Sequence, residues 1–468
     1  MDNRIVARVH KIHKGSSARL KEYLDTRIGN TLNGVNSCDP VTNLLRYDFF
    51  IDKVKEYIEN NKNANMGLAI VYSDIRFFKY FNEKFGYTVA NGLLTRFADS
   101  IRGSGDTGIA ACRVHSDNIV SAVAFDASWD VDEFVQRINQ KNRELEAEMQ
   151  NVFMNHQIII NTGIYITRTT YGIDAEIAIS NANLARKRAK TIESPEAVLF
   201  SDSMMKEMVQ QLELVQNLPN AIADEELTVY YQPKIECGTE KVMGAEALVR
   251  WIKPDGSFIY PDQFIPLFES NGLIVEVDYY VYKKVFEYIR HCIDEGVPIV
   301  PISMNISRTH LVSDEIFQYI KDLFDKYQIP PELVEFELTE NIYMENIDST
   351  LTLINDLRNI GIRISMDDFG SGYSSLNVLN NLPIDVLKLD RVFMTNTLNN
   401  NQQIILTSIV EMAKKLNISV ICEGVENYSQ SKFLSNIGCD MIQGYYYSKP
   451  LSQKNFALYL ANHMSEKN

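Results

Sequence analysis

The 468-residue sequence lacks the features that mark several large classes of protein. It has no apolar run of about 18 residues, the length that a membrane-spanning helix requires. Its opening stretch, MDNRIVARVHKIHKG, has no apolar core of a signal peptide. Its six cysteines form neither a CxxC pair nor a Cys/His spacing typical of zinc sites. We therefore expect a cytoplasmic protein with reduced thiols, no membrane span and no disulfide framework.

Basic residues are also fewer than acidic residues, and the difference lies in one half of the chain. Residues 1–210 contain equal numbers of basic and acidic residues, so residues 211–468 carry the whole net charge of −15. A protein that binds a nucleic-acid polymer needs a basic face to displace counterions, so this acidic half argues against such a partner. A phosphate-bearing ligand would need metal ions there to offset repulsion by the carboxylates.

The first half of the chain alternates helical and strand patterns. Expected helices cover 47–60, 77–101, 130–149 and 174–190, and expected strands cover 67–74, 108–114, 117–125, 156–167 and 197–201. This order predicts an α/β domain with a mixed sheet over residues 38–200. Residues 1–37, polar and mildly basic, are interpreted as an N-terminal extension made of a short helix and a loop. Apolar residues at helical spacing in 201–225 predict a helical connector.

The second half is more regular. Eight short apolar runs lie at 227–233, 242–251, 299–307, 333–340, 362–370, 384–390, 418–426 and 441–448, most of them separated by amphipathic helical stretches. This pattern predicts a (β/α)8 barrel of the TIM type over residues 226–462. Only the segment KIECGTEK joins the first two runs, and a parallel crossover needs a dozen or more residues. We therefore expect a modified barrel whose first two strands form an antiparallel pair.

Polar or charged side chains recur near the C-terminal ends of these runs, where the loops of a barrel build its site. Six of them are carboxylates, namely Glu246, Glu337, Asp367, Asp368, Glu423 and Glu426. Gathered at one mouth, they would repel one another and take up protons unless hard cations lay among them. A ligand set made of oxygen alone favours Mg²⁺ or Mn²⁺ over zinc. The adjacent pair Asp367 and Asp368 is a natural bridge for two ions of the kind that serve phosphoryl hydrolysis.

The order and spacing of these motifs resemble the EAL-domain cyclic di-GMP phosphodiesterases over roughly residues 215–462. The matching segments are GAEALVRW (244–251), NIS (305–307), ELTE (337–340), DDFGSGYSS (367–375), LKLD (387–390), EGVE (423–426) and QGYYYSKP (443–450). The resemblance implies that cyclic di-GMP is the substrate and that it is hydrolysed to linear pGpG.

The resemblance also implies a role for each matched residue. Two metal ions would be held by Glu246, Asn305, Glu337, Asp367 and Asp368. Glu423 would be the general base and Lys388 would hold a water, although a buried lysine among carboxylates could equally serve only as a counter-charge. On the substrate side, Gln232 and Arg250 would contact the dinucleotide, and Glu426 and Gln443 would support the water network. Glu340 would steady the DDFGSGYSS loop.

Residues 38–200 resemble the GGDEF diguanylate cyclase domain through DPVTNLL (39–45), FFKYFNEKFGY (77–87) and ANLARKRAK (182–190). Where the GGDEF signature would stand, the chain reads His115-Ser116-Asp117-Asn118-Ile119. The resemblance implies a degenerate nucleotide site in which Asp74 and Asp117 keep metal-ligand positions, Asn82 keeps a guanine contact and Asn91 replaces a guanine-reading aspartate. We expect no cyclase activity, and either a regulatory domain that binds GTP or a structural module.

Two other functions stay open from the sequence. The chain could be a non-catalytic receptor for cyclic di-GMP that signals through a protein partner, or a bifunctional enzyme with residual cyclase activity. The resemblance also implies a homodimer.

Overall fold

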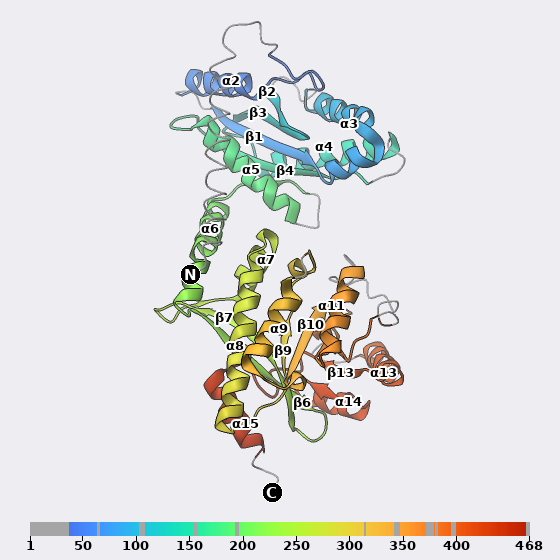
Figure 1. Ribbon diagram of the computed structural model, residues 1–468. Helices are drawn as coiled ribbons and strands as arrows, with labels where there is room; N and C mark the ends of the chain where they lie inside the picture. The colour runs from blue at the N-terminus through green and yellow to red at the C-terminus, as the bar shows by residue number, and fades with distance from the viewer. Residues whose placement is uncertain are drawn as a thin grey trace. The chain divides into compact units, whose positions relative to one another are not determined.

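The computed structural model describes residues 37–62, 66–102, 108–152, 157–191, 196–312, 315–340, 347–370, 379, 382–394 and 399–464. The chain divides into two compact units, Met1–Val209 and Gln210–Asn468, each with its own core (Figure 1). The extension expected at residues 1–37 lies outside the described residues except for Ser37. Within the described ranges, no helix is both long and apolar enough to cross a bilayer.

The first unit is built on a five-stranded mixed sheet, as the sequence predicts. Its strands lie in the order β2-β3-β1-β4-β5, and the bounds are β1 Met66–Ile75, β2 Gly108–His115, β3 Asn118–Asp126, β4 Ile160–Thr167 and β5 Val198–Leu199. All neighbouring strands are antiparallel except β4 and β5. The helices are α2 Tyr47–Asn60, α3 Phe78–Arg102, α4 Val131–Val152 and α5 Ala175–Thr191.

Both faces of this sheet are covered by helices, because successive side chains of a strand point to opposite faces. On β1, Ile70 and Tyr72 belong to a core with residues of α2 and α5. Ala69 and Val71 instead pack in a core with Phe134 of α4. The helix α6 Asp202–Ala223 follows, where the sequence predicts a helical segment.

The second unit is a closed barrel of eight strands. Their bounds are β6 Leu227–Glu236, β7 Val242–Ile252, β9 Ile302–Asn305, β10 Val334–Thr339, β11 Arg363–Phe369, β12 Val386–Leu389, β13 Ser419–Cys422 and β14 Met441–Ile442. From β7 to β14 each strand is parallel to the next, whereas β6 is antiparallel to both β7 and β14. The prediction of a modified barrel with an antiparallel first pair is confirmed.

Helices surround this barrel, and two short strands extend it. The helices are α7 Pro261–Asn271, α8 Ile274–Glu295, α9 Glu315–Tyr327, α11 Ile347–Asn359, α13 Asn400–Lys415, α14 Tyr428–Asn436 and α15 Gln453–Met464 (Figure 1). The short strand β8 Phe258–Ile259 pairs with β7, and β15 Leu451–Ser452 pairs with β6. Helix α8 buries Val277, Val281 and Val285, whose four-residue spacing gives one apolar face toward the barrel.

One feature of the strands differs from the sequence-based expectation. Glu246 and Gln232 were expected near the C-terminal ends of their strands, but they lie directly opposite each other in the middle of the β6–β7 ladder. The pairing of β6 with β7 continues beyond these residues to Leu227 and Trp251. The two strands therefore form a ribbon that extends beyond the other strands of the barrel. The remaining strands are shorter than the apolar runs, so Glu423 and Gln443 come directly after β13 and β14.

Candidate active site

Lys388 lies at the centre of a cluster of carboxylates inside the barrel. It is on β12 and has no exposed surface. Its Nζ is 2.7 Å from Glu423 Oε1, 3.0 Å from Asp367 Oδ1 and 3.6 Å from Glu246 Oε2, and it also forms an ion pair with Glu337. Four carboxylates that are far apart in the sequence are therefore brought to one ammonium group, as expected for strand residues that converge in a barrel.

The position of Glu423 depends on a tight turn after β13. Its backbone N–H donates to the carbonyl of Leu389 at 3.0 Å, which ties the turn to the end of β12. Gly424 follows with φ 67°, and a Cβ at this position would lie 2.5 Å from the Cβ of Arg391. Only glycine fits both the left-handed backbone and the close approach. The turn therefore fixes Glu423 beside Lys388.

Asp367 and Asp368 lie at a bulge in β11. The pairing of β11 with β12 shifts register between Met366 and Phe369, and Asp368 has φ 57°. In a regular strand two successive side chains would point to opposite faces, whereas a bulge redirects one of them. Asp368 donates its backbone N–H to Asp367 Oδ1 at 2.8 Å. Burial and the neighbouring Asp367 raise the pKa of Asp368 to about 6.

Three amide side chains surround Glu246. Gln443 donates to Glu246 Oε2 at 2.6 Å, and Asn305 donates to Glu246 Oε1 at 3.3 Å. Gln443 also contacts Gln232 Oε1 at 3.2 Å. Asn305 and Gln443 thus bond directly to the Glu246 carboxylate, and Gln232 is linked to it through Gln443. Gln443 Oε1 is buried and has no hydrogen-bond partner among the described residues, so this acceptor can take a further ligand.

Sequence reasoning missed two buried residues of this site, Lys234 and Glu335. Lys234 Nζ lies 2.8 Å from Glu335 Oε1 and 2.9 Å from Glu337 Oε1, and Ser365 donates to Glu335 at 2.6 Å. A signal for both was present in the sequence. Lys234 is two positions after Gln232, and Glu335 is two positions before Glu337, so each shares a strand face with a predicted site residue.

The charges of the cluster shift several pKa values. Burial raises the pKa of Glu423 to about 8 and also raises that of Glu246. Burial likewise opposes ionisation of Glu337, but the ammonium groups of Lys234 and Lys388 outweigh it and lower its pKa to about 2. Although burial disfavours a charged lysine, the surrounding carboxylates hold the pKa of Lys388 well above its ordinary value. The cluster is therefore short of positive charge.

The residues present fit divalent cations by their chemistry. Glu246, Glu335, Glu337, Asp367 and Glu423 give five buried or nearly buried carboxylates against the ammonium groups of Lys234 and Lys388, with Arg363 3.9 Å from Glu335. Carboxylate and amide oxygens suit Mg²⁺ or Mn²⁺. In the part of the chain that the structure describes, no three His, Cys, Asp or Glu side chains already converge as a metal-binding group. The types of side chain present suit a divalent cation, although the oxygens of the described side chains are not yet arranged around a single metal position.

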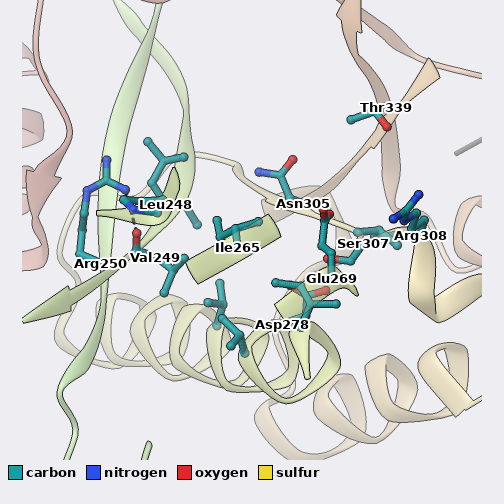
Figure 2. Close-up of a pocket in the computed structure, with 16 residues that line it drawn as sticks. Leu248, Val249, Arg250, Ile265, Glu269, Asp278, Asn305, Ser307, Arg308 and Thr339 are labelled. Carbon is teal, nitrogen blue, oxygen red and sulfur yellow. Dashed lines mark hydrogen bonds between the residues drawn. The ribbon is translucent and has the colours of Figure 1, made fainter. Parts of the chain in front are cut away.

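A cavity of about 460 Å³ adjoins the cluster. It is lined by Arg250 of β7, Asn305 of β9 and the apolar side chains of α7 and α8, and Figure 2 shows Ile265 between Arg250 and Asn305. The charged residues Glu269, Asp278 and Arg308 also line it. Arg250 Nη1 donates to the carbonyl of Val249 at 2.8 Å, and its guanidinium lies over the ring of Tyr230 at 5.8 Å. The cavity therefore joins apolar walls to a guanidinium and to the amide that bonds with Glu246.

Glu426 and Glu340 are the other two predicted residues of the barrel. Glu426 is exposed, and its backbone N–H donates to Gln430 Oε1 at 2.8 Å. The turn after Glu423 carries Glu426 to the surface, and its expected role in supporting the water network stays a prediction. Glu340 is buried directly after β10. Residues 371–375 of the DDFGSGYSS loop that it was expected to steady lie outside the described residues.

The structure places two of the predicted nucleotide-site residues of the first unit together. Asp74 lies near the end of β1, and Asp117 in the β2–β3 turn accepts from the backbone N–H of Ile75 at 2.9 Å. Burial and Asp74 raise the pKa of Asp117. Asn82 and Asn91 lie on α3, on opposite sides of a kink at Gly86.

Comparison with known proteins agrees with both halves of this description. Residues 215–450 match the EAL domain, and residues 36–194 match the diguanylate cyclase GGDEF domain. Cyclic di-GMP phosphodiesterase NbdA of Pseudomonas aeruginosa is 29% identical over 88% of this chain and 52% of its own length. Cyclic di-GMP phosphodiesterase PdeR of Escherichia coli is 29% identical over 91% of this chain and 64% of its own length.

A bifunctional relative and a solved structure complete the comparison. The bifunctional diguanylate cyclase/cyclic di-GMP phosphodiesterase MucR of Pseudomonas aeruginosa is 28% identical over 88% of this chain and 60% of its own length, so the chain spans between half and two thirds of these relatives. The S helix-GGDEF-EAL structure of Vibrio cholerae LapD has a TM-score of 0.55 at 21% identity, covers 92% of this chain and 99% of that chain, and has the same fold. The chain belongs to the EAL domain family, with a GGDEF domain preceding its EAL domain.

Proposed function

We propose that this chain is a metal-dependent phosphodiesterase whose EAL domain hydrolyses cyclic di-GMP to linear pGpG. The observation that carries the proposal is the convergence of Glu246, Glu337, Asp367 and Glu423 on Lys388. Relatives that resemble both of its domains are cyclic di-GMP phosphodiesterases. Two Mg²⁺ or Mn²⁺ ions, held by Glu246, Asn305, Glu337, Asp367 and Asp368, would supply positive charge to the phosphodiester and polarise the attacking water.

Side chains of the barrel would perform proton transfer, hold the attacking water and orient the carboxylates. Glu423 is proposed as the general base that takes a proton from the attacking water. Burial raises its pKa to about 8 in the metal-free chain, so the cations that the site would hold are needed to lower this pKa and free the carboxylate near neutral pH. Lys388 is fully buried, charged and within 2.7 Å of Glu423, so it can hold that water by donating a hydrogen bond. Gln443 and Gln232 fix the orientation of the Glu246 carboxylate through their hydrogen-bonded chain.

We propose that the adjoining cavity receives part of the dinucleotide. Its volume of about 460 Å³ and its walls of Ile265, Val277 and Val281 suit a planar base. Arg250 lines the same cavity and offers a cation to a phosphate. This arrangement supports the substrate contact expected of Arg250. Gln232 does not line the cavity, and its contact with the dinucleotide is proposed from the resemblance alone.

We propose further that the GGDEF domain has no cyclase activity and serves a regulatory or structural role. His115 and Ser116 stand where the family has its two glycines, and Ser116 has φ 51°, in the left-handed region that favours glycine. Side chains at these positions crowd the backbone surface that would approach a nucleotide. A homodimer is also proposed, and the exposed Ile404 and Ile405 on α13 give an apolar surface that supports it.

The test is release of pGpG from cyclic di-GMP in the presence of Mg²⁺ or Mn²⁺, followed by chromatography. The wild type should release pGpG, and Glu246→Gln and Glu423→Gln should each abolish release while the chain stays folded. Glu411→Gln, a change at an exposed glutamate of α13, is the matched control and should retain activity. Release that persists in both site variants would refute the assignment. Intact cyclic di-GMP bound at one molecule per chain would instead favour the receptor.

A further inference from the structure

Asp74, the residue that the cyclase resemblance assigns to a divalent cation, is held by cationic side chains of the protein itself. Its exposed fraction is 1%. Its Oδ2 forms ion pairs with Arg186 and Lys190 of α5, and its Oδ1 accepts from Asn161 Nδ2 at 2.8 Å. Both oxygens of this carboxylate therefore already have partners.

The guanidinium of Arg186 is fixed in this position by several contacts. Arg186 is 7% exposed. Its Nε and Nη2 donate to Asn183 Oδ1 at 2.9 and 2.8 Å, while Nη1 donates to Asp74. The guanidinium carbon Cζ lies 5.1 Å from the ring centre of Tyr72, a cation–π distance. These contacts hold the Arg186 side chain in one position, so its ion pair with Asp74 is a stable feature of the folded domain.

The packing of α5 explains why an arginine reaches this place. A Cβ added to Gly163 of β4 would lie 2.0 Å from the backbone nitrogen of Arg186 and 2.2 Å from the carbonyl of Ala182. The helix backbone thus lies directly on the sheet, and its buried face consists mainly of small residues such as Ala178 and Ala182. From so close an approach, the arginine side chain extends across β4 to the end of β1.

The local charges are balanced without a metal ion. Asp74 and Asp117 supply two carboxylates, and Arg186 and Lys190 supply two cations. A divalent cation would have to displace both basic side chains, and it would leave a buried guanidinium without its carboxylate, which is costly. The residues present therefore do not fit the metal ion that the GGDEF family implies.

We infer that Arg186 and Lys190 replace the divalent cation in this domain, so that Asp74 anchors α5 to β1 instead of binding metal–GTP. The GTP-binding role expected from the sequence is thereby disfavoured at this site. Asp74 and its neighbouring oxygen atoms should therefore bind a divalent cation only when the side chains of Arg186 and Lys190 are removed.

The first experiment titrates the full chain with Mn²⁺ and counts the bound ions by electron paramagnetic resonance. The Arg186→Met/Lys190→Met variant should bind one more Mn²⁺ per chain than the wild type, and adding Asp74→Asn should remove that extra ion. Arg188→Met, on the exposed side of the same helix, should leave the count unchanged. Because only differences between variants are read, the result does not depend on how many ions the barrel binds. A folded double variant with no extra ion would overturn the inference.

The second experiment needs no change at Arg186 or Lys190. The wild type is titrated with GTP and Mg²⁺, alongside Asn82→Ala, a change at a half-buried residue of α3. The inference predicts either that GTP does not bind or that it binds equally well to the wild type and to Asn82→Ala, because Arg186 and Lys190 already occupy the cation position. Binding of metal–GTP that Asn82→Ala abolishes would show that the nucleotide site is open, and would overturn the inference even if the double variant fails to fold.

Discussion

At the scale of single residues, the barrel contains two lysines that are buried and charged. Lys388 faces four carboxylates, and Lys234 bridges Glu335 and Glu337. The sequence predicted Lys388 and its four partners, because strand-end residues of a barrel converge. Lys234 and Glu335 were missed although each lies two positions from a predicted residue of its own strand, because the ion pair between them joins β6 to β10 and depends on how the barrel closes. A counter-charge of this kind orients carboxylates before any ligand binds.

Loss of Lys234 should be expensive for stability. Lys234→Met leaves Glu335 and Glu337 without their shared cation, and removing one partner of a buried ion pair typically costs about 3–5 kcal/mol. Urea unfolding should show a loss of that order, and Lys241→Met, at an exposed residue of the same hairpin, should show almost none. Adding Glu335→Gln to Lys234→Met should restore part of the lost stability. A Lys234→Met variant as stable as the wild type would contradict this account of the cluster.

The raised pKa of Glu423 gives stability a definite pH dependence when metal ions are removed by a chelator. The folded chain keeps the proton up to about pH 8, whereas the unfolded chain loses it near the ordinary value of 4.5. Between these pH values the folded state binds more protons, so stability falls as pH rises, with a limiting slope of about 1.4 kcal/mol per pH unit.

The Glu423→Gln variant isolates this effect, because glutamine does not titrate. We expect the wild type to lose stability relative to Glu423→Gln as the pH is raised from 5 to 8, measured by urea unfolding in chelator. Parallel curves for the two proteins would mean that Glu423 ionises normally.

At the scale of elements, the fold was largely predictable and the details of packing were not. Hydrophobic periodicity gave the eight strands of the barrel, and the short KIECGTEK link required the antiparallel β6–β7 pair. The length of the β6–β7 ribbon was not predictable, because its extension depends on pairing with the short flanking strands. The contact between Arg186 and Asp74 was also hidden, since it arises from the close approach of α5 to the sheet at Gly163.

The turn after β13 should control catalysis through the position of Glu423. Gly424→Ala adds a Cβ 2.5 Å from that of Arg391 at φ 67°, so the turn must shift. Gly256→Ala is the matched control, because Gly256 has φ 83° with open space around its Cβ position. Both variants should lose about 1–2 kcal/mol from left-handed strain. Only Gly424→Ala should lower kcat, by tenfold or more, with little change in KM; equal kcat values would contradict the role of the turn.

At the scale of the whole molecule, the two domains differ in how their carboxylates are neutralised. In the GGDEF domain, Arg186 and Lys190 pair with Asp74, whereas the carboxylates of the barrel outnumber its buried cations. The acidic excess of residues 211–468 agrees with a barrel that takes up divalent cations. Ions that bind only the folded state should stabilise it, by about 2.7 kcal/mol at a hundredfold excess over the dissociation constant. We expect Mn²⁺ to raise the melting temperature of the wild type. The Glu337→Gln/Asp367→Asn variant should show little of this increase, and an equal increase in both proteins would place the ions elsewhere.

The most direct measurement is calorimetric titration of the full chain with Mn²⁺ in the presence of cyclic di-GMP, with Glu423→Gln used to prevent turnover. We predict uptake of two ions per chain, and loss of that uptake when Glu337→Gln and Asp367→Asn are added. If the chain binds cyclic di-GMP but takes up no divalent ion, the carboxylates around Lys388 do not form a metal-dependent phosphodiesterase site.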